Sequence, residues 1–143
     1  MNEPPPGPAG LFALIHAAEV AQSHVESKLS GLGLSLPKLA ALRALSAAGE
    51  SLPLGQLAER LSCVKSNITQ LVDRLEADGF VARAPDPNDR RARLAVMTAA
   101  GRKACDEGSR VQDQTERELF AALSVEEAHQ LAALVGKLTR RAG

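Results

Sequence analysis

The spacing of apolar residues predicts that most of this chain is helical. In six stretches they recur every three or four positions, the period of a helix with one buried face. Ser35 before the second stretch and the capping box that begins at Ser124 are helix start signals, and Gly79 is expected to end the fourth helix with a positive φ. The expected helices are 11–30, 35–47, 53–61, 65–77, 98–123 and 124–139.

Two short strands are predicted after the fourth helix, at Phe80–Arg83 and Arg93–Met97. The residues between them, 84–92, hold two prolines and an Asn-Asp pair, which predicts a protruding loop without regular structure. The helices at 53–61 and 65–77 have the spacing of a helix-turn-helix. The predicted fold is therefore mainly α with a small β-hairpin wing, a winged helix-turn-helix whose terminal helices form a dimerisation domain.

The fourth helix has an unusual polar face. Its apolar stripe is Ile68, Leu71, Val72 and Leu75, and its other face carries short donors and acceptors with two cations, namely Lys65, Ser66, Asn67, Thr69, Gln70, Asp73 and Arg74. Amide and hydroxyl groups can meet base edges in a major groove, whereas Lys and Arg meet phosphates. An amphipathic helix alone is generic, but its combination with the preceding helix 53–61 and a basic hairpin favours duplex DNA.

Charge is concentrated in one segment although the chain has a formal net charge of zero. Residues 80–103 hold six basic and two acidic side chains, a local charge of +4, as expected of a surface that meets a polyanion. The chain has no Trp, no Tyr and only three Phe, so few rings could stack on unpaired bases. This composition disfavours a binder of RNA or single strands.

The terminal helices pose a separate question, because a winged helix needs only about 70 residues. The apolar stripes outside it must be buried elsewhere, and a homodimer is the economical answer. We therefore expect a flexible Pro-rich tail at 1–10 and one domain at 11–143, in which 11–34 and 99–143 are dimerisation helices and 35–98 is the winged unit.

Several classes of function lack support in the sequence. Cys63 and Cys105 form no CxxC, the three histidines are scattered, and no Ser/His/Asp or Cys/His arrangement is visible. We therefore expect no metal, no cofactor and no enzymatic activity. No long apolar run or signal peptide is present, which predicts a cytoplasmic protein without a membrane partner.

Three segments, LVDRLEADGFVAR, DPNDRRARLAVMT and AAGRK, resemble the multiple antibiotic resistance regulator (MarR) family of bacterial transcription factors. The resemblance covers residues 11–140. It implies a homodimer on a pseudo-palindromic double-stranded operator, with helix 65–77 in the major groove and Asp89 holding Arg91 for the minor groove. One departure is Val64, where the family usually has a Ser N-cap.

The resemblance also implies release of the operator by a small aromatic or phenolic effector in a cleft beside the dimer helices. His16 and Arg43 are its candidate anchors, although both could be ordinary packed or surface residues. Two alternatives remain open, a winged protein-interaction module without DNA and a redox-sensing regulator that uses Cys63. The expected DNA-binding residues are Lys65, Ser66, Asn67, Thr69, Gln70, Arg74, Asp89, Arg90, Arg91 and Arg93.

Overall fold

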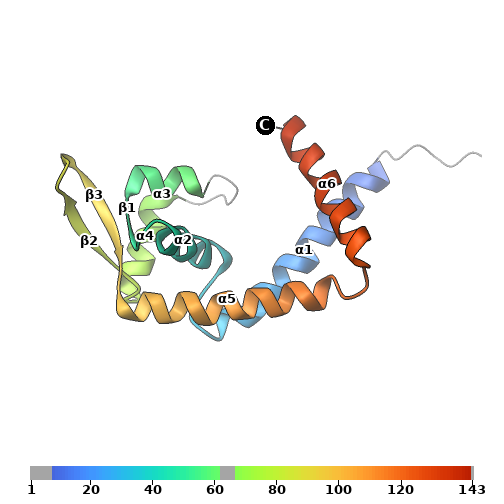
Figure 1. Ribbon diagram of the computed structural model, residues 1–143, viewed down its shortest axis with the longest axis horizontal. Coiled ribbons are helices and arrows are strands. Elements are labelled where there is room, and N and C mark those ends of the chain that lie inside the picture. The colour runs from blue at the N-terminus through green and yellow to red at the C-terminus, as the bar shows by residue number, and fades with distance from the viewer. Residues whose placement is uncertain (1–7, 62–66, 143) are drawn as a thin grey trace, which may run out of the picture. The chain divides into compact units, whose positions relative to one another are not determined.

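The computed structural model describes residues 8–61 and 67–142, and its fold is the predicted one, mainly helical with a small antiparallel sheet (Figure 1). The chain divides into two compact units, one that ends at Gln112 and one that begins at Asp113. Among the described residues, every helix is too short or too polar to cross a membrane. The elements are α1 Pro8–Ser30, α2 Leu36–Ala47, β1 Ser51–Pro53, α3 Leu54–Arg60, α4 Ile68–Ala77, β2 Val81–Asp86, β3 Asp89–Met97, α5 Ala99–Leu119 and α6 Val125–Ala142.

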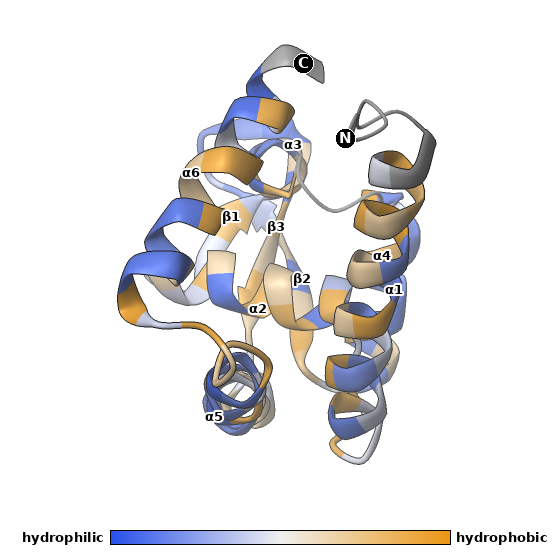
Figure 2. Ribbon diagram, turned by 90° about the vertical axis from the view of Figure 1, so that its right-hand side faces the viewer, coloured by the Kyte–Doolittle hydropathy of each residue, from blue (hydrophilic) through white to orange (hydrophobic). Residues whose placement is uncertain are grey.

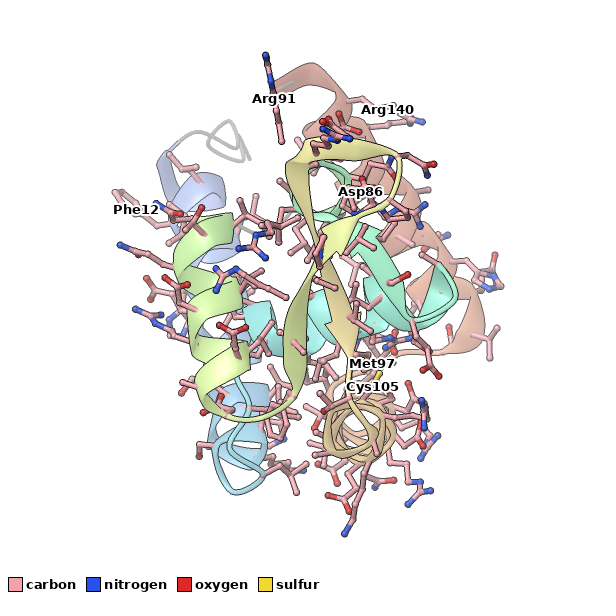
Figure 3. The ribbon with its side chains drawn as sticks, turned by 90° about the vertical axis from the view of Figure 1, so that its left-hand side faces the viewer. Phe12, Asp86, Arg91, Met97, Cys105 and Arg140 are labelled. Atoms are coloured by element: carbon pink, nitrogen blue, oxygen red, sulfur yellow. The ribbon has the colours of Figure 1, made fainter. Side chains whose placement is uncertain are left out.

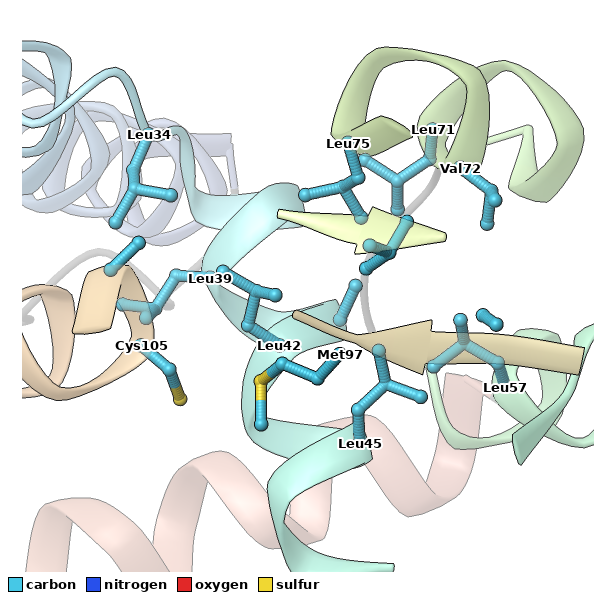
Figure 4. Packing of buried hydrophobic residues seen from close by; sticks show 14 of the residues in the cluster. Leu34, Leu39, Leu42, Leu45, Leu57, Leu71, Val72, Leu75, Met97 and Cys105 are labelled. Carbon is cyan, nitrogen blue, oxygen red and sulfur yellow. The ribbon is translucent and has the colours of Figure 1, made fainter. Parts of the chain in front are cut away.

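The core of the first unit is built mainly from leucines (Figure 4). The predicted stripe of α2, Leu39, Leu42 and Leu45, is fully buried, and Ser35 caps this helix by accepting the N–H of Lys38. Leu57 of α3 and Leu75 of α4 are also fully buried in the same cluster. Side chains of all three helices therefore meet in one hydrophobic core, and this packing holds the buried face of α4 in place.

The sheet has three strands in the order β1-β3-β2, all antiparallel. The two-stranded prediction missed β1, and the predicted loop at 84–92 is wrong because β2 and β3 continue to a turn at Pro87–Asn88. A proline cannot donate to a ladder, but Pro85 is tolerated because β2 is an edge strand. The hairpin is thus longer and more regular than expected.

Several helix ends also differ from the prediction. α3 begins at Leu54 because Pro53 is the last residue of β1. α1 begins at Pro8, three residues before the predicted start, and a proline suits the first turn of a helix because its missing N–H is not needed there. α5 ends at Leu119 and α6 continues to Ala142, so these boundaries were also misplaced by a few residues.

The junction between the sheet and α5 is tied to the end of α4. Gly79 has the predicted positive φ of 79°, and its carbonyl accepts the hydroxyl of Thr98 at 2.6 Å. The same hydroxyl caps α5 by accepting the N–H of Gly101 at 3.0 Å. A Cβ at Gly101 would lie 2.0 Å from the Phe80 carbonyl oxygen, so only glycine permits this approach. Gly101 therefore serves packing although it weakens the helix.

In the second unit, α6 begins with the predicted capping box. Ser124 N donates to Glu127 at 2.9 Å, and Glu127 N donates to the Ser124 hydroxyl at 3.1 Å. The helix is amphipathic, yet its apolar residues are exposed; hydrophobic residues recur along α6 and along α1 in Figure 2. The largest exposed apolar side chains of the two helices are Leu11, Phe12, Leu14, Ile15, Val20, Val125, Leu131, Leu134, Val135 and Leu138.

Candidate nucleic-acid interface

The helix α4 begins at Ile68, later than the predicted 65, and it has a well-formed N-cap. Asn67 has an extended backbone, and its side-chain oxygen accepts the N–H groups of Thr69 at 3.1 Å and Gln70 at 3.3 Å. The cap is therefore Asn67, whereas Val64, at the position where the family usually has a Ser, lies outside the described residues. An asparagine can take this role because its oxygen reaches the free amides of the first turn.

One face of α4 is buried and the other is open to solvent. Leu71, Val72 and Leu75 pack into the core, as the stripe predicted. The exposed residues include Asn67, Thr69, Gln70 and Arg74, four of the predicted DNA-binding residues. Gln70 and Arg74 border a hollow of about 230 Å³ whose other wall is the start of α2. The structure thus brings amide, hydroxyl and guanidinium groups onto one accessible surface.

The wing presents a cluster of exposed arginines. Its turn at Pro87–Asn88 is stabilised by the Asp86 carboxylate, which accepts the N–H of Asn88 at 2.9 Å. The predicted residues Arg90, Arg91 and Arg93 are all exposed on β3. Figure 3 shows the Arg91 side chain extending from the tip of the hairpin. These cations are free to approach phosphates.

Asp89 contacts Arg91, but through the backbone. The carboxylate of Asp89 accepts the backbone N–H of Arg91 at 2.9 Å. This bond shapes the strand just after the turn and so sets where the Arg91 side chain leaves the backbone. The role implied by the resemblance, in which Asp89 orients Arg91, is compatible with a backbone contact of this kind.

Arg83 is a residue that the sequence reasoning did not select. Its guanidinium contacts two acids of α4, with Nη2 2.6 Å from Asp73 Oδ1 and Nη1 3.0 Å from Glu76 Oε1. The pKa of Arg83 is raised, first by its hydrogen bond to Asp73. A sequence signal exists, since two acids three positions apart on the helix are followed by an arginine on the next strand, but only the fold shows that they meet.

Three predicted residues lie outside the described part of the chain, namely Lys65, Ser66 and Cys63. The other cysteine, Cys105, is buried on α5 beside the core, and burial raises the pKa of its thiol. A thiol in such surroundings is mostly protonated near neutral pH and reacts slowly.

The candidate effector residues His16 and Arg43 have different surroundings. His16 is exposed and borders an open hollow of about 480 Å³, whose lining comes from α1 alone: His16, Glu19, Val20, Ser23, His24 and Ser27. Arg43 projects from α2, where its Nη1 donates to Gln112 at 2.8 Å. Among the residues that the structure describes, no group of three His, Cys, Asp or Glu side chains could hold a metal ion.

Comparisons with known proteins agree with this geometry. The model of the MarR family matches residues 34–92. The transcriptional activatory protein BadR of Rhodopseudomonas palustris is 37% identical over 64% of this chain and 53% of its own length, so this chain spans about half of that relative. The HTH-type regulator YcgE of Bacillus subtilis is 32% identical over 78% of this chain and 72% of its own length.

A solved structure shows the same fold on DNA. A mutant MarR from E. coli, complexed with operator DNA, superposes with a TM-score of 0.79 at 26% identity. The match covers 90% of this chain and 93% of that protein. The similarity therefore extends to the terminal helices as well as to the winged unit.

Proposed function

Because the chain belongs to the MarR family of transcriptional regulators, we propose that it binds operator DNA through α4 and the wing. The observation that carries this proposal is the pairing, within one unit, of an exposed polar face on α4 with exposed arginines on β3. Polar side chains such as those of α4 can read base edges, and arginines such as those of β3 can neutralise phosphates. Regulation of transcription, and not catalysis, is the activity of the relatives.

The roles divide between the two elements. We assign base reading to Asn67, Thr69 and Gln70, with Lys65 and Ser66 as further contacts. Arg74 and the wing residues Arg90, Arg91 and Arg93 contact phosphates, and Arg91 also enters the minor groove, where a narrow A-tract favours a cation. Asp89 fixes the backbone from which Arg91 projects.

The protein acts as a homodimer on an inverted repeat. The exposed apolar residues of α1 and those of α6 each support this, because monomeric proteins rarely expose several large apolar side chains along one helix. Two copies of α4 related by a two-fold axis would read half-sites one helical turn apart, about 10 to 11 base pairs. We also infer a cytoplasmic location, since operator DNA lies there in the bacteria that supply the relatives.

We propose a repressor that a small aromatic or phenolic molecule releases from its operator, with His16 and Arg43 as the side chains to test. Titration of bound operator with salicylate tests the trigger, and His16→Ala and Arg43→Ala should weaken its effect. If no phenolic compound changes the operator affinity, the proposed release by an effector is wrong, but the proposed DNA binding is not affected.

The central experiment measures affinity against salt concentration. Duplexes are first selected from a random pool by the wild-type protein, and binding to a selected duplex is then compared with binding to a scrambled one. Arg91→Ala should weaken both and lower the salt slope by about 0.9. Gln70→Ala should leave the slope unchanged and reduce discrimination by about 1 to 3 kcal/mol.

A matched control is Arg110→Ala, which removes an exposed arginine of α5 outside the proposed interface. Its slope should equal that of the wild type. Selection that yields no preferred duplex would favour the alternative, a winged module that binds a protein. Equal slopes for Arg91→Ala and Arg110→Ala would show that the wing is not an electrostatic contact.

A further inference from the structure

The reading helix α4 carries two acids that should oppose DNA binding. Asp73 and Glu76 lie on its surface, and their side chains are 59% and 44% exposed. A carboxylate close to a duplex is repelled by the phosphates and can help only where it accepts a hydrogen bond from a cytosine. These acids therefore need an explanation if α4 enters a groove.

Arg83 engages both acids at the same time. Besides its two ion pairs, its Nη2 lies 3.4 Å from the carbonyl oxygen of Thr69, and its backbone N–H donates to Glu76 Oε2 at 3.2 Å. The side chain is only 21% exposed, and its donors point at α4. A guanidinium has five N–H donors in a fixed fork, so one residue can bind two carboxylates in this way.

Arg74, one residue beyond Asp73, is exposed on the same helix and carries the same charge. It is available to meet a phosphate, whereas the donors of Arg83 are directed at the helix itself. The two arginines thus form a natural pair for comparison, because they differ in surroundings and not in chemistry.

We propose that Arg83 is a positioning residue for DNA binding, which neutralises Asp73 and Glu76 and holds them against β2 so that α4 can approach the phosphates. Arg83 itself does not touch DNA. The contacts that support this assignment all lie within the first unit. The inference rests on the proposed DNA-binding function and adds to it a residue outside both the base-reading and the phosphate-contacting sets.

The test is a suppressor experiment on the selected duplex. Arg83→Met should weaken binding by about tenfold, or about 1.4 kcal/mol, because it leaves two carboxylates uncovered. Adding Asp73→Asn and Glu76→Gln to Arg83→Met should restore affinity to within about threefold of the wild type, since no charge then needs to be covered. Arg74→Met is the matched control, and the same two amide substitutions should not restore it to that level.

Further variants separate the possible outcomes. Asp73→Asn with Glu76→Gln in the presence of Arg83 should bind at least as well as the wild type; weaker binding would show that the acids read bases and would overturn the proposal. Equal recovery of the Arg83 and Arg74 variants would reveal a general effect of net charge, and no recovery of either would make Arg83 a direct contact or a purely geometric support. Each of these results would also overturn it.

The proposal remains testable if Arg83→Met folds poorly, which circular dichroism would show. Arg83→Lys keeps one charge but cannot span two carboxylates, so its affinity should fall between those of the wild type and Arg83→Met. An Arg83→Lys protein with wild-type affinity would contradict the proposal. If the wild type binds no duplex at all, the proposed DNA-binding function itself is wrong. This result is distinct from the results above, which contradict only the role of Arg83.

Discussion

The helices α4 and α6 carry apolar stripes of the same spacing but of opposite exposure. Both stripes follow the pattern i, i+3, i+4, i+7: Ile68, Leu71, Val72 and Leu75 on α4, and Leu131, Leu134, Val135 and Leu138 on α6. Leu75 is fully buried, whereas the equivalent Leu138 is 55% exposed. The pattern therefore predicts a helix in both cases but does not say what covers it.

The difference comes from what the chain places beside each helix. α4 packs on α2, on α3 and on the strand β2 that follows it, so its stripe closes within the same unit. The stripe of α6, in contrast, stays exposed in the described structure. A stripe that stays exposed needs a second surface, and the proposed dimer would supply it.

The largest expected effect comes from truncating a side chain in the buried stripe of α4. Leu75→Ala removes a fully buried side chain from the core and should lower the free energy of unfolding by about 2–5 kcal/mol. Denaturation with urea at a fixed protein concentration measures this. Leu138→Ala is the matched control, and its smaller cost should depend on protein concentration, as expected for a side chain buried by association. If both variants lose the same free energy of unfolding at every protein concentration, the proposed difference between α4 and α6 is wrong.

The exposed stripe should matter for association. Leu134→Asp should weaken the dimer by at least about tenfold, because one buried leucine contributes about 1.5–3 kcal/mol. Sedimentation over a range of concentrations measures the dissociation constant. His129→Asp introduces the same side chain on the opposite side of α6 and should leave association unchanged. A Leu134→Asp protein that associates like the wild type would show that α6 is not part of the interface.

A smaller effect is expected from changes to the N-cap of α4. Asn67→Ala removes the acceptor for two amides and should destabilise the protein by about 1 kcal/mol. Asn67→Asp retains an acceptor and should keep most of this stability. Thermal unfolding of the two variants makes the comparison, and equal melting temperatures would mean that this cap contributes nothing measurable.

The smallest effect is a pH dependence confined to the cap of α6. The pKa of Glu127 is lowered, first by its hydrogen bond from the backbone of Ser124. A lowered pKa contributes stability above the unfolded value of about 4.3 and loses it as the pH falls through the folded value. Glu127→Gln should therefore reduce the pH dependence of stability below about pH 4.3. If the stability of Glu127→Gln falls with decreasing pH as steeply as that of the wild type, this carboxylate does not contribute to the pH dependence.

Local signals explain why much of the fold could be predicted. The caps at Ser35, Ser124 and Thr98, and the turn at Gly79, depend on residues within a few positions of each other. Sequence spacing alone reports such contacts reliably. The helices were accordingly found, with errors mainly at their ends.

Long-range contacts explain what was missed. β1 has only three residues and exists because it pairs with β3, a partner far away in the sequence. Pro85 indicated a loop, yet the edge position of β2 tolerates it. Likewise, the exposed polar face of α4 could be predicted from its own period, whereas Arg83 meets Asp73 and Glu76 only because β2 folds back beside α4.

The pairing of β1 with β3 has a consequence for the order of folding. These strands flank the whole helix-turn-helix, since β1 precedes α3 and β3 follows the hairpin turn. The hairpin of β2 and β3 closes a short loop, but adding β1 must close one that contains α3, α4 and β2, at a higher cost in chain entropy. During synthesis the sheet can be completed only after β3 has emerged, so we expect a nascent chain to form its reading helix before that helix has its final support.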